Sequence, residues 1–133
     1  MTTDEFTFAD IADCQGRSGC WISVHADNAH VGISADMMEE LDAEDGHAFV
    51  LAFDAQSRPW VGVLPHARHG CPSINAKSSA HVYSTSLAVK LRRWTKDGQR
   101  TRFYWTGETR MARTDERLAV NLYRVTPGGA AHA

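Results

Sequence analysis

Basic residues are scarce in the first half of this 133-residue sequence, and the whole chain lacks several features that would indicate a functional class. No apolar run approaches the roughly 18–20 residues of a membrane-spanning helix. The first ten residues have no basic segment leading into an apolar stretch, so we expect no secretory signal. Glycine-rich phosphate-binding loops of the P-loop or dinucleotide type are missing, and no catalytic signature is present. The 3 cysteines are an odd number, which argues against a disulfide framework and predicts a cytoplasmic protein.

The composition that remains is that of one globular domain. Hydrophobic residues make up 43% and charged residues 23% of the chain, which excludes disordered, collagen-like and coiled-coil classes. A chain of this length buries roughly two thirds of its unfolded surface. We therefore expect a single domain over residues 1–133.

Charge is divided unequally along the chain. Residues 1–76 contain 3 basic and 12 acidic residues, a net charge of -9, whereas residues 77–133 contain 11 basic and 4 acidic residues, a net charge of +7. Such a division indicates a polyanion-binding face in the second half, or electrostatic pairing between the halves or between subunits of a homo-oligomer. Solvated faces on which like charges collect would leave the same pattern.

Two segments share a short motif and the order of the patterns that follow it. Ala29-His30-Val31 recurs 51 positions later as Ala80-His81-Val82, and each copy precedes a short helical pattern. An Asp-Gly turn and a strand-like run follow in both, and the turns, Asp45-Gly46 and Asp97-Gly98, lie 52 positions apart. This order predicts two tandem hairpin–helix–hairpin units. The units cover about residues 20–64 and 73–125, with a linker at 65–72 and a mobile tail at 126–133.

Each unit contains one short helix and several strands. In the first helix Ser34 is a candidate N-cap and Met37, Met38 and Leu41 form one apolar face. The second helix has Ser84, Thr85 or Ser86 as its cap and apolar positions at Leu87, Leu91 and Trp94. Alternating apolar runs predict strands at 20–25, 30–33, 49–53, 60–64, 73–76, 81–84, 102–106, 109–113 and 118–125. A type II′ turn is expected at Gly107-Glu108, and the tryptophans are expected to pack in the core.

The segment from His30 to Phe53 (HVGISADMMEELDAEDGHAFVLAF) resembles the core of the AbrB/MazE/SpoVT family of swapped-hairpin DNA-binding domains. In that family a strand and a capped helix with a conspicuous leucine lead through a glycine into a β-rich segment. Its members build a barrel from two such units, usually in two chains. For this chain the resemblance implies an internal pseudo-dimer that forms one mostly-β (α+β), AbrB-like or double-psi-like β-barrel.

The chain departs from the family pattern in its first hairpin. Family members carry Lys or Arg there, whereas this hairpin carries His25, Asp27 and His30. Only the second hairpin has a lysine, Lys77, and the tail lacks the acidic residues of antitoxin members. The resemblance therefore concerns the scaffold more than the binding surface.

The basic residues of the second half are the candidate nucleic-acid-binding site. On a helix, positions 92, 93 and 96 share a solvent-facing edge, and on a strand, Arg100 and Arg102 point to one face. Such a surface would neutralise several phosphates, and its arginines could reach guanine edges in a major groove. The candidate set is Lys77, Lys90, Arg92, Arg93, Lys96, Arg100 and Arg102. The alternative is a basic surface that pairs with the acidic first helix of a neighbouring subunit.

A His/Cys cluster in the linker is a second candidate site. His66, His69 and Cys71, with Cys14 and Cys20 upstream, are residue types that bind Zn²⁺. Their spacing matches no zinc finger, so we expect no cofactor and keep Zn²⁺ as the alternative. Three functions are open: a cytoplasmic nucleic-acid-binding regulator, a self-assembling protein-interaction module, and a metal-dependent enzyme that uses the linker cluster.

Overall fold

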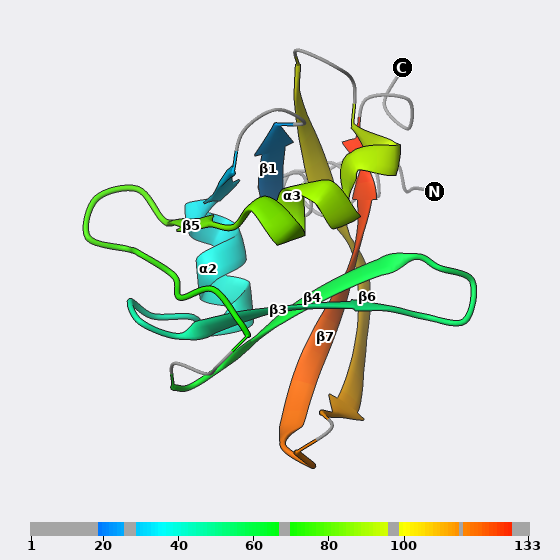
Figure 1. The fold of residues 1–133 in the computed structure, drawn as a ribbon. Coiled ribbons are helices and arrows are strands. Elements are labelled where there is room, and N and C mark those ends of the chain that lie inside the picture. The colour runs from blue at the N-terminus through cyan, green and yellow to red at the C-terminus, as the bar shows by residue number, and fades with distance from the viewer. Residues whose placement is uncertain (1–18, 26–28, 67–69, 96–98, 115, 129–133) are drawn as a thin grey trace, which may run out of the picture.

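One antiparallel sheet organises the chain (Figure 1). The computed structural model describes residues 19–25, 29–66, 70–95, 99–114 and 116–128. The strands follow the order β3-β4-β7-β6-β1-β2-β5. The elements run as β1 (Trp21–His25), β2 (His30–Ile33), α2 (Ala35–Leu41), β3 (Ala48–Phe53), β4 (Pro59–Leu64), β5 (His81–Tyr83), α3 (Thr85–Lys90), the 3-10 helix η1 (Arg92–Trp94), β6 (Arg100–Arg113) and β7 (Ala119–Pro127). The prediction of a mostly-β domain with short helices is confirmed.

The sheet curls into a nearly closed barrel. Its edge strands, β3 and β5, are bridged by a short segment at 72–75, in which Ser73 pairs with Ala48 and Asn75 pairs with His81. The amide of Phe49 also donates to the carbonyl of Pro72 at 2.9 Å. The last residue of the predicted linker thus takes part in the barrel wall. Within the described residues, no helix combines the length and the apolar character needed to cross a membrane.

The two halves of the chain are interleaved around the barrel. β1 lies between β2 and β6, and β4 pairs with β7. β2 pairs with β5 so that the valines of the two Ala-His-Val motifs lie opposite each other. Matching hydrogen bonds flank this pair: the amide of Ile33 donates to the carbonyl of Ala80 at 2.9 Å, and that of Ser84 donates to Ala29 at 2.8 Å.

Serine caps begin both helices. The Ser34 hydroxyl accepts from the amide of Met37 at 3.1 Å, as predicted. In the second half, Ser84 is the cap among the three serine and threonine candidates, and its hydroxyl accepts from the amide of Leu87 at 3.1 Å. Each bond satisfies one of the amides that the first helical turn leaves without a partner.

The second helix is shorter than its apolar spacing predicts. α3 ends at Lys90, and the chain tightens into the 3-10 helix η1, whose residues bond three positions back. This turn keeps Leu91 buried and lets Trp94 stack on Phe53 at 5.9 Å between ring centroids. Arg92 and Arg93 are exposed, as predicted, but they lie in a 3-10 helix and not in an α-helix. Lys96 and the turn at 97–98 lie outside the described residues.

The predicted hairpin turn at Gly107-Glu108 is also wrong. β6 continues through it, and its register with β7 shifts at this point, so the segment is a β-bulge. Gly107 has a φ of +97°, which glycine adopts without a steric cost, and the indole of Trp105 donates to the carbonyl of Glu108 at 3.0 Å. The chain reverses instead at 114–118, and β7 extends to Pro127, into the predicted tail.

Two apolar clusters fill the structure. The main cluster lies inside the barrel and includes Phe103, Ile22 and Met37, all fully buried. A smaller cluster of Ala48, Trp60, Leu64, Val120 and Leu122 lies between β3–β4 and the far part of β6–β7, beside an open cleft of about 470 Å³. Trp60 is buried as predicted, whereas Trp21, Trp94 and Trp105 are half-buried.

Candidate functional site

The outer surface of β5, β2, β1 and the start of β6 carries aromatic and basic side chains. Alternation along these strands turns Ile22, Val24, Val31 and Val82 inward, so their neighbours face solvent. We call this surface the ring-and-arginine face. It consists of Trp21, His25, His30, His81, Tyr83, Arg100 and Arg102.

Three rings gather where β2 pairs with β5. The imidazoles of His30 and His81 are stacked, with centroids 4.7 Å apart and planes 23° from parallel. Tyr83 stands nearly perpendicular to both, at 5.2 Å from His30 and 5.0 Å from His81. Because it is almost equally close to both imidazoles, the phenol ring lies along the side of the pair. It is nevertheless 66% exposed.

Two guanidinium groups lie on the other side of the same face. Arg102 sits over the ring of Trp21, with its guanidinium carbon 4.1 Å from the centroid. Arg100 donates to the Ser23 hydroxyl at 3.2 Å. Both arginines are exposed, and among the described residues neither forms an ion pair with a carboxylate. Their charges therefore remain available to an anion.

Strand register connects the rings to the arginines. On one row across four strands, His81 lies opposite Gly32, Gly32 opposite Ser23, and Ser23 opposite Arg102. The middle of this row thus carries only a hydrogen atom and a hydroxymethyl group between an imidazole and a guanidinium.

Its surroundings lower the pKa of the His30 imidazole. Burial lowers the pKa of its imidazole first, and the nearby His81 and Arg100 lower it further. The positive potential of Arg100 therefore reaches across β1 to the ring cluster. A ring with a lowered pKa stays neutral at pH 7 and acts as an aromatic surface rather than as a cation.

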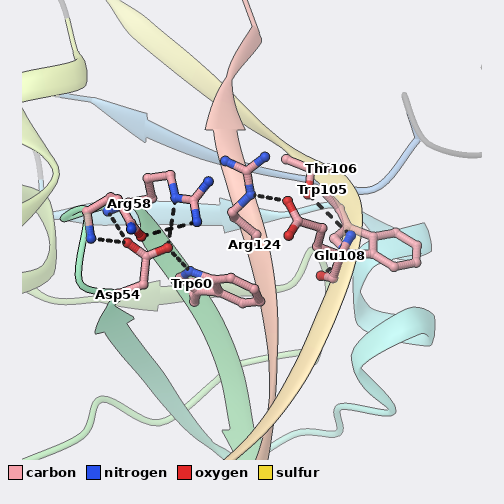
Figure 2. A network of polar contacts seen from close by, with 8 residues as sticks. Asp54, Arg58, Trp60, Trp105, Thr106, Glu108 and Arg124 are labelled. Atoms are coloured by element: carbon pink, nitrogen blue, oxygen red, sulfur yellow. Dashed lines mark hydrogen bonds and ion pairs between the residues drawn. The ribbon is translucent and has the colours of Figure 1, made fainter.

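A second polar network has the opposite character (Figure 2). Asp54 accepts from Arg58 Nε and from the Trp60 indole, both at 2.8 Å, and from two amides of its own turn. Glu108, in the bulge of β6, binds Arg124 Nε at 2.5 Å. We call this the carboxylate-locked region, because each arginine here is held by a carboxylate.

The protonation of Asp54 reflects its hydrogen bonds. Burial on its own would raise the pKa of Asp54, but the bonds from Trp60, Arg58 and the amide of Gln56 outweigh it and hold the pKa far below its usual value. Such a carboxylate closes the β3–β4 turn and stays charged at all ordinary pH values.

The basic residues singled out from the sequence are spread over three segments. Lys77 is exposed in the loop before β5, Lys90 ends α3, and Arg92 and Arg93 are exposed in η1. Only Arg100 and Arg102 lie on one strand face with the ring cluster. Lys96 lies outside the described residues.

The linker cluster is described only in part. His66 is exposed and Cys71 half-buried, whereas His69 and Cys14 lie outside the described residues. Within the part of the chain that the structure covers, no three potential ligands come together. Cys20 is buried, and burial, followed by the charges of nearby Glu40, Asp36 and Glu39, raises the pKa of its thiol. That thiol keeps its proton and would be a poor metal ligand.

Comparison of the chain with models of protein families, with curated proteins and with solved structures finds no match in any of the three. The chemistry of the ring-and-arginine face therefore carries the functional argument.

Sequence reasoning missed the ring residues of this face. It used Ala-His-Val as a marker of internal order but assigned no role to His30, His81 or Tyr83. Alternation alone places each of these rings on the polar side of its strand. The missing information was that β2 and β5 are neighbours, which no local pattern reveals.

Proposed function

We propose that this protein binds nucleic acid through the ring-and-arginine face and acts as a small cytoplasmic regulator. The observation that carries the proposal is the pair of exposed arginines, Arg100 and Arg102, on the same sheet face as an aromatic cluster whose Tyr83 is exposed. Guanidinium groups neutralise phosphates and release counterions, and exposed rings offer stacking surfaces to bases. The same arginines, bound to carboxylates, would have indicated a structural role.

Salt dependence tests this proposal. We expect a fluorescein-labelled oligonucleotide to bind, with affinity falling steeply between about 50 and 200 mM salt. Replacing both arginines (Arg100→Gln with Arg102→Gln) should reduce the log–log slope by about 1.4 for a single strand or about 1.8 for a duplex, because two phosphate contacts are lost.

A matched pair of arginines at the opposite end of β6 serves as the control. Arg113→Gln with Arg117→Gln removes the same charge from the reversal at 114–118, where Arg113 donates to the carbonyl of Arg117. This pair should leave the slope unchanged. Absence of binding at low salt, or an equal loss in the control, would contradict the proposal.

We further propose that the barrel consists of two tandem AbrB-like units in one chain. Support comes from the exchange of partners: β1 pairs with β6, and the corresponding segment at 73–75 meets β3 and β5. The matching hydrogen bonds around the β2–β5 pair have the form expected of a pseudo-two-fold axis. Family members usually carry Lys or Arg on the first hairpin, which this chain replaces by histidine.

Self-association is a second candidate function. The exposed carboxylates of α2, Asp36, Glu39 and Glu40, form no ion pair within the described part of the chain. They could meet Arg100 and Arg102 of another copy. Sedimentation would then show a dimer or larger species that dissociates as salt is raised, and a monomer under all conditions would contradict this candidate.

A further inference from the structure

We infer that the bound nucleic acid is single-stranded and that one of its unpaired bases stacks on Tyr83. This inference rests on the proposed function and specifies its substrate class. It depends on the exposure of the Tyr83 ring, on the position of that ring relative to the two arginines, and on the small side chains in the row that joins His81 to Arg102.

Tyr83 is the exposed ring of the cluster. The two imidazoles contact the ring in T-shaped arrangements, with interplanar angles of 72° and 81°. An exposure of 66% leaves most of the residue accessible to solvent, and so to a stacking partner. The contacts with His30 and His81 also restrict the rotation of Tyr83, which reduces the entropy that binding must still remove.

A base reaches such a ring only when it is unpaired. In a duplex both faces of an internal base are covered by its neighbours, whereas single strands offer bases that stack on aromatic side chains. Grooves of duplex DNA are read instead by a protruding helix or β-ribbon. The rings here lie on a sheet surface, which suits a strand laid across it.

The arginines lie a few strand spacings from Tyr83, within the reach of a short single strand that stacks a base on this ring. β5 and β6 are separated by β2 and β1, so Tyr83 and Arg100 are three strand spacings apart, about 14 Å. The row that leads from Tyr83 to Arg100 carries His30 and His25. The adjacent row, from His81 to Arg102, carries only Gly32 and Ser23 between its ends, so no bulky side chain rises there from the surface. A short single strand could place a base on Tyr83 and phosphates beside Arg100 and Arg102.

The decisive measurement compares one sequence in two forms. A labelled single-stranded 12-mer is titrated against the wild-type protein, and the same sequence is then titrated as a duplex. We expect the single strand to bind more tightly. Tyr83→Ala should weaken single-strand binding about 5- to 150-fold, as expected for one stacked base, and Tyr83→Phe should keep most of the affinity because it retains the ring.

Met111→Ala is the matched control for Tyr83→Ala. Met111 is also a large exposed side chain, 64% accessible, but it lies near the end of β6 that is remote from Arg100 and Arg102. It should leave binding unchanged. The ring protons of Tyr83 should also shift upfield when the single strand is added.

The outcomes separate this inference from the proposed function. Equal binding of both forms, with no effect of Tyr83→Ala, would overturn single-strand stacking while phosphate binding by the arginines stands. Failure of both forms to bind would overturn the proposed function and this inference together.

Discussion

The ring-and-arginine face and the carboxylate-locked region both contain arginine and tryptophan, but their arginines have different partners. In the locked region Arg58 and Arg124 are held by carboxylates, at 2.8 Å and 2.5 Å. On the ring-and-arginine face Arg100 rests on a hydroxyl and Arg102 on an indole. An arginine bound to a carboxylate has its charge compensated, whereas one beside a neutral group keeps it for a ligand. The contrast shows that the partner of an arginine, rather than the arginine itself, indicates its role.

The contrast also separates stability from binding. We expect substitutions in the locked region, and in the core below either region, to change stability. Substitutions on the ring-and-arginine face should change binding and leave the folded state nearly as stable.

The largest expected effect lies in the core. Phe103 is fully buried in the main cluster below the ring-and-arginine face, so Phe103→Ala should cost about 3–5 kcal/mol of unfolding free energy. Leu122, in the smaller cluster, is 8% exposed and lines the open cleft, so Leu122→Ala should cost only about 2 kcal/mol. Urea unfolding followed by tryptophan fluorescence measures both. Equal costs would show that the two clusters are packed to the same density.

The two cap serines directly follow β2 and β5 and should contribute more stability than the ring cluster on these strands. Ser34 accepts from the amides of Met37 and Trp21 and donates to the carbonyl of Gly19, so Ser34→Ala should cost about 2 kcal/mol. Ser84→Ala should cost about 1 kcal/mol, because the Ser84 hydroxyl makes only the cap bond within the part of the chain that the structure describes. Tyr83→Ala should stay within about 0.5 kcal/mol of the wild type. A larger loss for Tyr83→Ala would give the ring cluster a structural role.

Acidification should remove the stabilisation that Asp54 provides in the carboxylate-locked region. The pKa of Asp54 is depressed in the folded protein, so its charged form stabilises the fold above its unfolded pKa of about 4, and this contribution is lost as the pH falls below that value. Asp54→Asn should therefore lower the Tm at pH 7 and approach the wild-type Tm near about pH 2. Arg100→Gln should leave the loss of stability between about pH 4 and pH 2 as it is in the wild type, because Arg100 does not contact Asp54. A constant Tm difference at all pH values would show that Asp54 acts through shape rather than charge.

The smallest effect concerns the surface ion pair. Arg124→Gln should cost at most about 1 kcal/mol, because Glu108 is 47% exposed and water screens the pair. Arg100→Gln, which breaks no ion pair among the described residues, should stay within about 0.5 kcal/mol. Thermal unfolding should show the Arg124 effect shrinking in about 1 M salt. An effect that persists in high salt would indicate packing by the arginine stem instead.

Local signals predicted the elements better than their partners. The Ser34 cap, the β3–β4 hairpin and its turn at 54–59 follow from residues a few positions apart, and all are present. The bulge at Gly107 was mistaken for a turn because a glycine with positive φ serves in both. The pairing of β6 with β7 on both sides of the bulge decides between them, and that contact lies outside any local window.

The sequence predicts the position of the arginines in the candidate site but not that of the rings, because only the arginines are close together in the chain. The period of a strand places Arg100 and Arg102 on one face, which is where they lie. His30, His81 and Tyr83 come from segments about 50 residues apart, and only the β2–β5 pair brings their rings within 5.2 Å.

The sequence by itself determined the mostly-β character of this chain, the serine that begins its first helix, and the side of each strand that faces solvent, because these depend on side-chain alternation and on bonds within a few residues. Only the tertiary structure decided which strands are neighbours, and therefore which arginines meet carboxylates and which meet rings. Strand pairing over long separations is selected by the burial of the whole core, a sum over distant residues that no segment contains.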